Sequence, residues 1–498
     1  MNPRLTQIKI IALLILFLCA GLFLLHTYKV APIEHPQMES TRCWFGKLSQ
    51  NYKTECYWIT LPENHASPTT NTVKIPLAIF RNTTSTSKAP VLHLGAGGPG
   101  APMYLNENYV VDYLIDSHDD FSLKNGRDFY VIDPRGAGLS SPRLVCQHFV
   151  DNLPARLAQH LSIKEEWQKV DADYLQCIED FMQRNINFAH YNSQSVVWDI
   201  EALRQILGIP TWSLIGVSYG AVYAQMLAHY YPDTVESMIL DSAAFPNLKM
   251  DNRYVERSYA PYKALYNYCD ADPECEAPLP NLQTRLWALY DSLQHSPITL
   301  FLDHPYKESD ILEVRLTGER FIGSLMEGIY SEEVFYQLPQ IIRDMENSDY
   351  SSVQPFLEDH LAFLLDDTYG DLSASAHYCF EDKPFINYEN LLPLIEQFSE
   401  PQLRYTFGLS LTWQDYCEKM GIPSAPPEFA QALNTDIPTL FLHGKLDTVT
   451  PLEDVQAMQA NFSRSEIRAY HLSHGILGVE PNAENDVKHF LDSLSPAQ

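Results

Sequence analysis

The strongest constraint on the fold lies at residues 216–220, which read Gly-Val-Ser-Tyr-Gly. The apolar run at 212–216 is typical of a short buried strand, and the stretch that follows, to about Tyr231, has the pattern of a helix. A serine between two glycines at such a junction fits a sharp strand-to-helix turn, which lifts the side chain of Ser218 above the end of the strand. The helix points its N-terminus at the same place. The pattern therefore predicts that Ser218 is a nucleophile at the edge of a sheet.

Short apolar runs of the same kind recur along the chain. They occupy residues 90–94, 128–133, 237–241 and 438–443, and a further strand fits at 466–471. Strands that alternate with helical stretches build a parallel sheet whose two faces are both covered. Two earlier runs, at 57–61 and 73–80, flank a polar stretch and predict a hairpin. Because ligand chemistry in such sheets lies at the carboxyl ends of the strands, we expect the glycine-rich and polar clusters that follow these runs to meet there.

The sequence pattern changes between about residues 246 and 437, where few segments predict strands and most predict helices. The clearest helical stretches are 282–293, 331–345 and 387–397. A chain of 498 residues is long enough for one large domain with an insertion. We therefore expect an α/β core formed by residues 31–245 and 438–498, interrupted by a mainly helical cap at 246–437.

A serine hydroxyl becomes a good nucleophile only when a base removes its proton. Asp447 follows the predicted strand at 438–443, and His474 begins the loop after the predicted strand at 466–471. We expect His474 to take the proton of Ser218, and Asp447 to fix the tautomer of the imidazole and stabilise its charged form. The nearest competitor, His471, falls within the strand pattern and is assigned a structural role.

The intermediate of acyl transfer carries an oxyanion, which needs hydrogen-bond donors held in place in advance. The backbone N–H of Tyr219 is one expected donor. The other is expected from the loop that contains Gly97 and Gly98, where glycines let the main chain approach closely.

Four motifs together resemble those of the prolyl aminopeptidase and tripeptidyl aminopeptidase group of serine peptidases. They are Gly-Gly-Pro-Gly at 97–100, Asp-Pro-Arg-Gly-Ala-Gly-Leu-Ser at 133–140, the motif at 216–220, and Asp-Thr-Val-Thr-Pro at 447–451. Length and the apolar start are most similar to the larger, secreted tripeptidyl branch. The resemblance implies the α/β-hydrolase fold, a mostly parallel sheet flanked by helices with an inserted helical cap, and no metal or organic cofactor.

Two positions depart from the smaller prolyl enzymes. Ala96 stands where those enzymes have His, and Pro134 where they usually have Gln. These departures argue against strict specificity for proline and leave the hydrolase assignment intact.

The resemblance implies an exopeptidase acting on peptides with a free N-terminus, and such an enzyme needs carboxylates to hold the substrate ammonium. The candidates are Glu381, Asp382 and Glu327. Glu381 ranks first because Cys379, if disulfide-bonded, would hold it near a rigid point. Arg135 is expected to pair with an acid and brace its loop.

Two other functions use the same residues differently. A carboxylesterase or lipase-like hydrolase would share the triad, because the pocket rather than the fold decides the substrate. A non-catalytic binding protein on a hydrolase scaffold is the second alternative. The presence of Ser218, Asp447 and His474 together argues against it.

The start of the chain suggests export. Arg4 and Lys9 precede an apolar run at residues 10–25, which is typical of a signal peptide or a short membrane anchor. Residues 1–30 are therefore expected to form such a segment, and the protein is expected to be exported, as a periplasmic, membrane-anchored or secreted bacterial protein.

Cysteine usage agrees with an oxidising compartment, because an even number of cysteines lies outside the apolar run. They are Cys43, Cys56, Cys146, Cys177, Cys269, Cys275, Cys379 and Cys417. Sequence alone does not choose among their pairings, and we expect neighbours in chain order to pair. No C-x-x-C motif occurs, so a metal site is not expected.

Charge excludes one class of partner. The chain has 34 Lys and Arg against 63 Asp and Glu, a formal net charge of -29. Binding to nucleic acid requires the opposite balance. The acidity serves solubility, or draws in cationic substrates such as peptides with a free ammonium. The oligomeric state is not predicted.

Overall fold

The computed structural model describes residues 37–67, 71–85, 87–95, 97–248, 266–267, 269, 280–327, 332–386 and 416–494. The apolar run at 10–25 and the predicted helix at 387–397 lie outside the described residues. Within those residues, no helix combines the length and the apolar content that crossing a bilayer requires.

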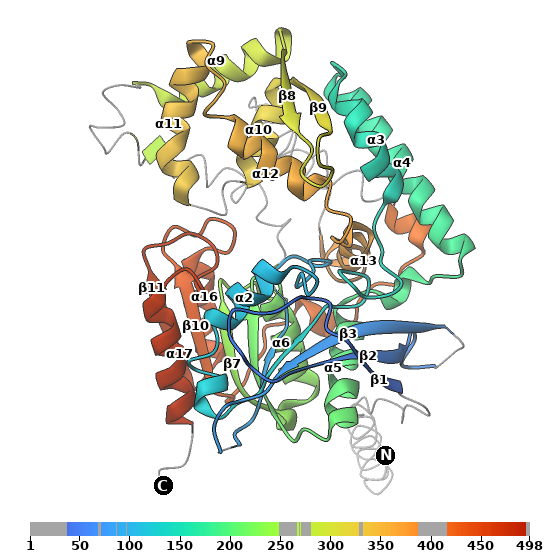
Figure 1. Ribbon diagram of the computed structural model, residues 1–498, viewed down its shortest axis with the longest axis vertical. Helices are drawn as coiled ribbons and strands as arrows, with labels where there is room; N and C mark the ends of the chain where they lie inside the picture. The colour runs from blue at the N-terminus through green and yellow to red at the C-terminus, as the bar shows by residue number, and fades with distance from the viewer. Residues whose placement is uncertain are drawn as a thin grey trace, which may run out of the picture.

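A twisted sheet of nine strands forms the lower half of the molecule (Figure 1). Its order is β1-β2-β3-β5-β4-β6-β7-β10-β11. The bounds are β1 Gln37–Thr41, β2 Thr54–Pro62, β3 Thr72–Phe80, β4 Val91–His93, β5 Phe129–Ile132, β6 Trp212–Val217, β7 Val235–Asp241, β10 Thr439–Gly444 and β11 Ser465–Tyr470. The first three strands run antiparallel and all pairings from β5 to β11 are parallel. The predicted fold class and hairpin are therefore confirmed.

Alternation along the central strands sends side chains into two apolar clusters, one on each face of the sheet. Leu92 and Leu214 enter the cluster that also holds residues of α5, α6 and α16. Their neighbours Val91 and Ile215 enter the cluster shared with α2 and α17. The flanking helices are α2 Asn108–Asp116, α5 Ser193–Leu207, α6 Gly220–Tyr230, α16 Leu452–Met458 and α17 Pro481–Ser493.

A second layer lies beyond the carboxyl edge of the sheet, at the top of Figure 1. It contains α9 Leu282–His295, β8 Ile298–Asp303, β9 Ile311–Leu316, α10 Gly318–Glu327, α11 Glu332–Glu346 and α12 Gln354–Leu364. Helix α13 Asp371–Glu381 connects this layer to the core (Figure 1). The strands β8 and β9 form an antiparallel pair that the sequence reading did not predict.

The upper layer has its own apolar cluster, and that cluster extends beyond the predicted insertion. It includes Leu153 and Leu157 of α3 Gln147–Leu157, which packs against α4 Ile163–Gln183. Part of the chain before residue 246 thus packs with the upper layer, and the limits of the cap stay a prediction.

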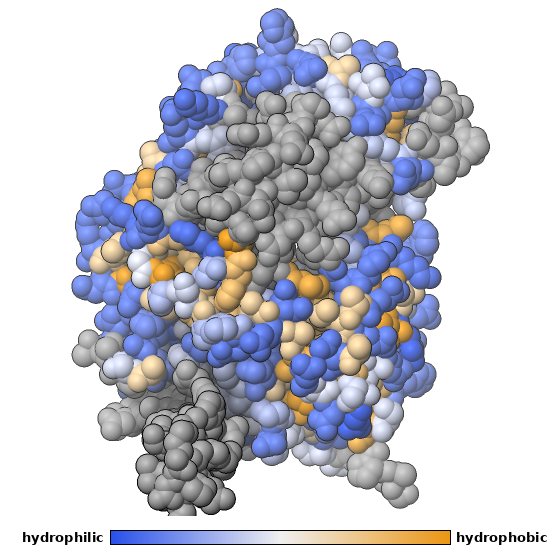
Figure 2. Space-filling view, turned by 180° about the vertical axis from the view of Figure 1, so that it is seen from behind, coloured by the Kyte–Doolittle hydropathy of each residue, from blue (hydrophilic) through white to orange (hydrophobic). Residues whose placement is uncertain are grey.

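Three disulfides connect neighbouring cysteines in chain order, as predicted. They are Cys43–Cys56, Cys146–Cys177 and Cys379–Cys417. The predicted pair of Cys269 and Cys275 includes a residue, Cys275, that lies outside the described residues. On the face shown in Figure 2, most of the described surface is hydrophilic, which agrees with the acidic composition.

Candidate active site

Ser218 occupies the turn between β6 and α6 with a positive φ of 53°, a conformation that non-glycine residues rarely adopt. The turn is fixed by main-chain hydrogen bonds. The N–H of Ser218 donates to the carbonyl of Asp241 at 2.8 Å, and the carbonyl of Ser218 accepts from Ala221 and Ala244, each at 3.1 Å. The predicted sharp turn is confirmed.

The two flanking glycines leave room for this turn. A β-carbon at Gly216 would lie 2.5 Å from the carbonyl oxygen of Gly220, and one at Gly220 would lie 2.9 Å from the carbonyl oxygen of Gly95. A larger residue at Gly216 would push the strand and the helix apart, and one at Gly220 would push the helix away from the loop after β4.

The loop after β4 approaches Ser218 just as closely. A β-carbon at Gly97 would lie 2.9 Å from Cβ and 3.3 Å from Oγ of Ser218, and Gly97 has a φ of +115°. Gly98 follows with a φ of +62°. Across from them, the backbone N–H of Tyr219 has no hydrogen-bond acceptor among the described residues. The loop thus lies against Ser218, and its role as an oxyanion donor stays a prediction.

Replacing Gly97 by Ala is expected to slow reaction at Ser218 by at least about 100-fold, because the methyl group would displace the loop from the oxyanion position. Labelling by a fluorophosphonate checks this. Gly208→Ala is the matched control, since Gly208 also has a positive φ, +64°, but its β-carbon would meet nothing within 4 Å. An unchanged rate in Gly97→Ala would contradict the assignment of this loop.

Asp447 follows β10 and is 5% exposed. Its Oδ1 accepts hydrogen bonds from the backbone N–H groups of Val449 and Thr450, both at 2.9 Å. Its Oδ2 accepts from the hydroxyl of Thr450 at 2.8 Å and from Nδ1 of His474 at 2.9 Å. An ionised carboxylate only accepts, so Nδ1 carries the proton and Nε2 is left as the basic nitrogen.

Burial by itself would raise the pKa of Asp447, but the hydrogen bond and charge of His474 bring it below its ordinary value of 3.8. His443 also lies near, with Nε2 3.6 Å from Oδ2 of Asp447, but its Nε2 faces the carbonyl of Thr450 at 2.5 Å. Burial lowers the pKa of His443, so this ring is neutral and its proton points at a carbonyl. His471, the predicted competitor of His474, is exposed just after β11.

The second glycine-rich motif acts as a brace. The buried carboxylate of Asp133, at the end of β5, accepts from the backbone N–H of Met103 at 2.6 Å and of Leu139 at 2.8 Å. Burial raises the pKa of Asp133 to about 6, although these two bonds oppose the rise. The carboxylate occupies the space that a β-carbon at Gly138 would need. Asp133 thus ties the loop after β4 to the loop after β5.

Arg135 pairs with an acid, as predicted. Its Nε and Nη2 donate to the two oxygens of Asp199 at 2.7 and 2.5 Å, and its Nη1 donates to the carbonyls of Glu63 and His190, both at 2.7 Å. Asp199 also contacts Nε2 of His65 at 2.7 Å. The guanidinium is fully buried, so Arg135 braces its loop as predicted.

Of the predicted ammonium-binding acids, Glu381 lies beside the nucleophile turn. It ends α13 and is 2% exposed. Its Oε1 accepts from the hydroxyl of Tyr219 and, at 2.9 Å, from the hydroxyl of Ser193. Burial and then the charge of Glu381 raise the pKa of Tyr219 well above its ordinary value, so the phenol stays protonated and donates.

The other two acids are placed differently. Asp382 is half-buried at the end of α13, next to Glu381. Glu327 is the last residue of α10, and its side chain lies outside what the structure describes. Of the three predicted acids, the structure shows Glu381 bonded to the side chain of Tyr219, the residue after Ser218.

The sequence reading missed Asp241, which ends β7 and contacts both the serine turn and the loop of His474. The available signal was its place at the carboxyl end of a parallel strand, between two strands that carry predicted site residues. It also missed the contact of the Tyr219 side chain with Glu381, because those residues lie on separate parts of the chain.

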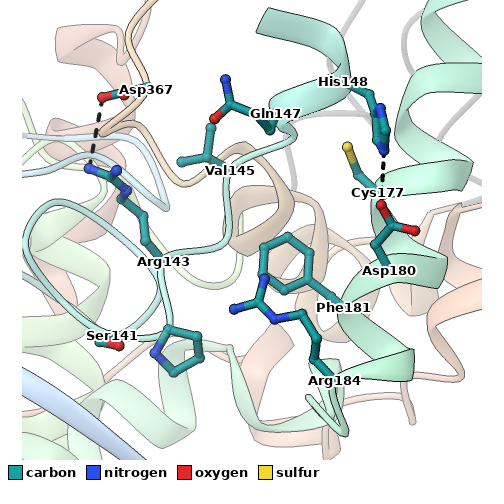
Figure 3. A pocket seen from close by; sticks show the side chains of 11 residues that line it. Ser141, Arg143, Val145, Gln147, His148, Cys177, Asp180, Phe181, Arg184 and Asp367 are labelled. Carbon is teal, nitrogen blue, oxygen red and sulfur yellow. Dashed lines mark hydrogen bonds and ion pairs between the residues drawn. The ribbon is translucent and has the colours of Figure 1, made fainter. Parts of the chain in front are cut away.

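A pocket of about 340 Å³ lies away from these residues, with its wall formed by the loop after β5 and by α4 (Figure 3). Arg143 and Arg184 face it from opposite sides, and the guanidinium of Arg184 lies over the ring of Phe181, 4.8 Å from its centroid. Arg143 pairs with Asp367 at 3.8 Å. Among the described residues, no group of three or more His, Cys, Asp or Glu could hold a metal ion.

The sequence profile of the alpha/beta hydrolase fold family matches residues 96–481 of this chain. Among curated proteins, the chain is 25% identical to the putative hydrolase YuaR of Escherichia coli K12 over 234 residues, which is 44% of this chain and 43% of that one.

The chain is also 26% identical to the serine protease Hip1 of Mycobacterium tuberculosis over 223 residues, 44% of this chain and 42% of that one. It is 26% identical to the tripeptidyl aminopeptidase of Streptomyces coelicolor over 203 residues, 39% of this chain and 36% of that one. The predicted resemblance to this peptidase group is confirmed at the level of sequence. Each alignment spans less than half of the relative's length.

Proposed function

This chain belongs to the alpha/beta hydrolase fold family, and from that premise we propose that it is a serine exopeptidase that cleaves peptides from a free N-terminus. The observation that carries the proposal is the hydrogen bond of 2.9 Å between Asp447 and Nδ1 of His474, at the same sheet edge as the turn that exposes Ser218. The two acyl-transfer steps require this set of an acid, a base and a nucleophile.

The proposed reaction runs as follows. Oγ of Ser218 attacks the scissile carbonyl while Nε2 of His474 takes its proton, and Asp447 stabilises the imidazolium that forms. The N–H groups of Tyr219 and of the loop at Gly97 and Gly98 stabilise the oxyanion. His474 then gives the proton to the leaving amine, and water releases the acyl group by the same steps in reverse order.

The preference for a free N-terminus rests on the acid beside the nucleophile. The buried carboxylate of Glu381 accepts a hydrogen bond from the hydroxyl of Tyr219, the residue after Ser218, and so provides negative charge next to the nucleophile turn. A charge-assisted hydrogen bond to a substrate ammonium contributes about 1.5–3 kcal/mol. We assign this role to Glu381 first, with Asp382 and Glu327 as further candidates. The names of two relatives, a serine protease and a tripeptidyl aminopeptidase, support a peptide substrate.

We also propose that the protein acts after export. Three disulfides in the described residues favour an oxidising compartment, because thiols stay reduced in the cytosol. The same proposal assigns residues 10–25 to a signal peptide or a membrane tether.

A small substrate panel tests the function. It holds Pro-, Ala- and Ala-Ala-Pro-aminomethylcoumarin, each with a free and an acetylated N-terminus, and a short-chain p-nitrophenyl ester. We expect cleavage of free peptides only, no activity in Ser218→Ala, and a KM raised about tenfold for free peptides in Glu381→Gln, since one charge-assisted bond is lost.

Two outcomes would contradict the proposal. Turnover of the ester with every peptide left intact would assign the protein to the carboxylesterases. Activity that survives in Ser218→Ala would show that Ser218 is not the nucleophile and would contradict the proposed triad. The pattern of cleaved substrates also tells how many residues leave at once.

A further inference from the structure

His474 lies in the loop after β11, and that strand alone does not hold the loop in place. Strand β11 is the edge of the sheet and pairs with β10 alone. The loop after it has no regular structure and contains Gly475 and Gly478, with φ of +83° and +85°. A base that must meet the serine within hydrogen-bond distance therefore needs support from elsewhere.

The loop obtains this support by crossing back over the end of β10. Gly444, the last residue of β10, has no space for a β-carbon because the carbonyls of Leu472 and Ser473 lie over it. The N–H of Leu446 donates to the carbonyl of Leu472 at 3.0 Å. This crossing brings the residues after His474 above β7.

At the end of β7, one buried carboxylate receives the loop. Asp241 is 1% exposed. Its two oxygens accept from the N–H of Ile476 at 3.0 and 2.9 Å, and Oδ2 also accepts from the N–H of Leu477 at 2.8 Å. Burial raises the pKa of Asp241, and the bonds from these two N–H groups oppose the rise.

The next residue extends the same support. Oγ of Ser242 accepts from the N–H of Gly475 at 2.9 Å and donates to Asp241 at 3.2 Å. Its carbonyl accepts from the hydroxyl of Thr450 at 3.0 Å, and that hydroxyl group also contacts Asp447. Asp241 in turn accepts the N–H of Ser218 with its own carbonyl.

We propose that Asp241, with Ser242, is the positioning residue of this site, which holds the loop of His474 in register with the turn of Ser218. No other described residue bonds both segments: its carbonyl fixes the nucleophile turn and its carboxylate fixes the base loop. The inference rests on the proposed function, because it assigns a role relative to the proposed base.

Asp241→Asn tests the inference, since the amide keeps the size of the side chain but turns one acceptor into a donor that faces backbone N–H groups. The measurement is the rate constant and the final extent of labelling by a fluorescent fluorophosphonate. We expect a rate at least about tenfold and up to about 100-fold lower, with the final extent unchanged, because the base is displaced and the fold persists. If Asp241 only stabilised the fold, its replacement would lower the final extent of labelling and leave the rate constant unchanged.

Asp371→Asn is the matched control. Asp371 is a partly buried carboxylate that also accepts backbone N–H bonds, from Cys146 and Leu372, both at 2.8 Å, but it contacts neither segment of the site. Its variant is expected to label at the wild-type rate. If Asp241→Asn does not fold, Ser242→Ala removes the acceptor of Gly475 and is expected to slow labelling about tenfold.

The outcomes separate the two proposals. Wild-type protein that is not labelled, or labelling that persists in Ser218→Ala, would overturn the proposed function. A second outcome overturns only the inference about Asp241. In it, labelling depends on Ser218, but Asp241→Asn, or Ser242→Ala in its place, is labelled less than tenfold more slowly than wild type. The proposed function would then still stand.

Discussion

Replacement of Asp447 by Asn is expected to lower kcat about 10⁴-fold, with little change in KM, as for the acid of serine-protease triads. The Asn oxygen can still accept the N–H bonds of Val449 and Thr450, so its amide nitrogen would face His474. Because that nitrogen is a donor, His474 would bind it through an unprotonated Nδ1. Nε2 would then carry the proton and could not act as the base.

Steady-state kinetics on the best substrate of the panel, with fluorophosphonate labelling beside it, measures this effect. Asp454→Asn is the control, because Asp454 is a buried acid in the following helix, α16, and its loss removes the same charge. A loss of less than tenfold in Asp447→Asn would show that another acid supports His474.

Replacement of Arg135 by Met is expected to lower the free energy of unfolding by about 3–5 kcal/mol, because the buried carboxylate of Asp199 loses both hydrogen bonds from the guanidinium and keeps only its contact with His65. The guanidinium also saturates the carbonyls of Glu63 and His190, which would lose their donor. Domains are stable by only about 5–15 kcal/mol, so the variant should unfold at markedly lower urea concentration.

The size of this loss should grow with pH. Burial raises the pKa of Asp199, but Arg135 brings it below the ordinary value of 3.8, so the stability that this carboxylate contributes is present above its unfolded pKa and is lost as pH falls through the folded one. Without Arg135, only His65 opposes the effect of burial, so the pKa of Asp199 is expected to rise and its ionisation to contribute less to stability. The difference between wild type and variant is therefore expected to increase from pH 4 to pH 7.

Urea unfolding at several pH values measures the effect, with Arg468→Met as control. Arg468 forms ion pairs with Glu466 and Asp486 at the surface, where all three side chains are partly exposed. Exposed pairs contribute about 0–1 kcal/mol. If the two variants lost the same free energy of unfolding at pH 7, the buried ion pair would contribute no more to stability than the exposed one.

Most of the parallel strands could be predicted because they are nearly uninterrupted apolar runs, as in β5, where all four residues are buried, whereas β11 has charged residues among its apolar ones. Strand β1 could not, since its residues are polar and lie at the exposed edge, held by pairing with β2 alone. In the upper layer, β9 does alternate between exposed and buried side chains, but its charged residues Glu313 and Arg315 hide that pattern among helical signals.

The site divides in the same way. Ser218, Asp447 and His474 each follow a recognisable strand, so their positions could be predicted from local patterns. Asp241 acts through residues more than 230 positions later, and no local pattern carries such a contact. For Glu381, the sequence suggested an acid beside the site, but only the structure shows that Tyr219 and Ser193 bind it.

The order of the strands along the chain has a consequence for how this protein is made. Ser218 precedes the upper layer in the sequence, whereas β10 and β11, and with them Asp447 and His474, follow it. A growing polypeptide that has emerged from the ribosome only as far as β7 holds the proposed nucleophile without its acid and base. On the proposed mechanism, translation that stops anywhere before residue 474 yields no active hydrolase. Activity is therefore acquired only when β11 pairs at the edge of the sheet and the loop with His474 follows it.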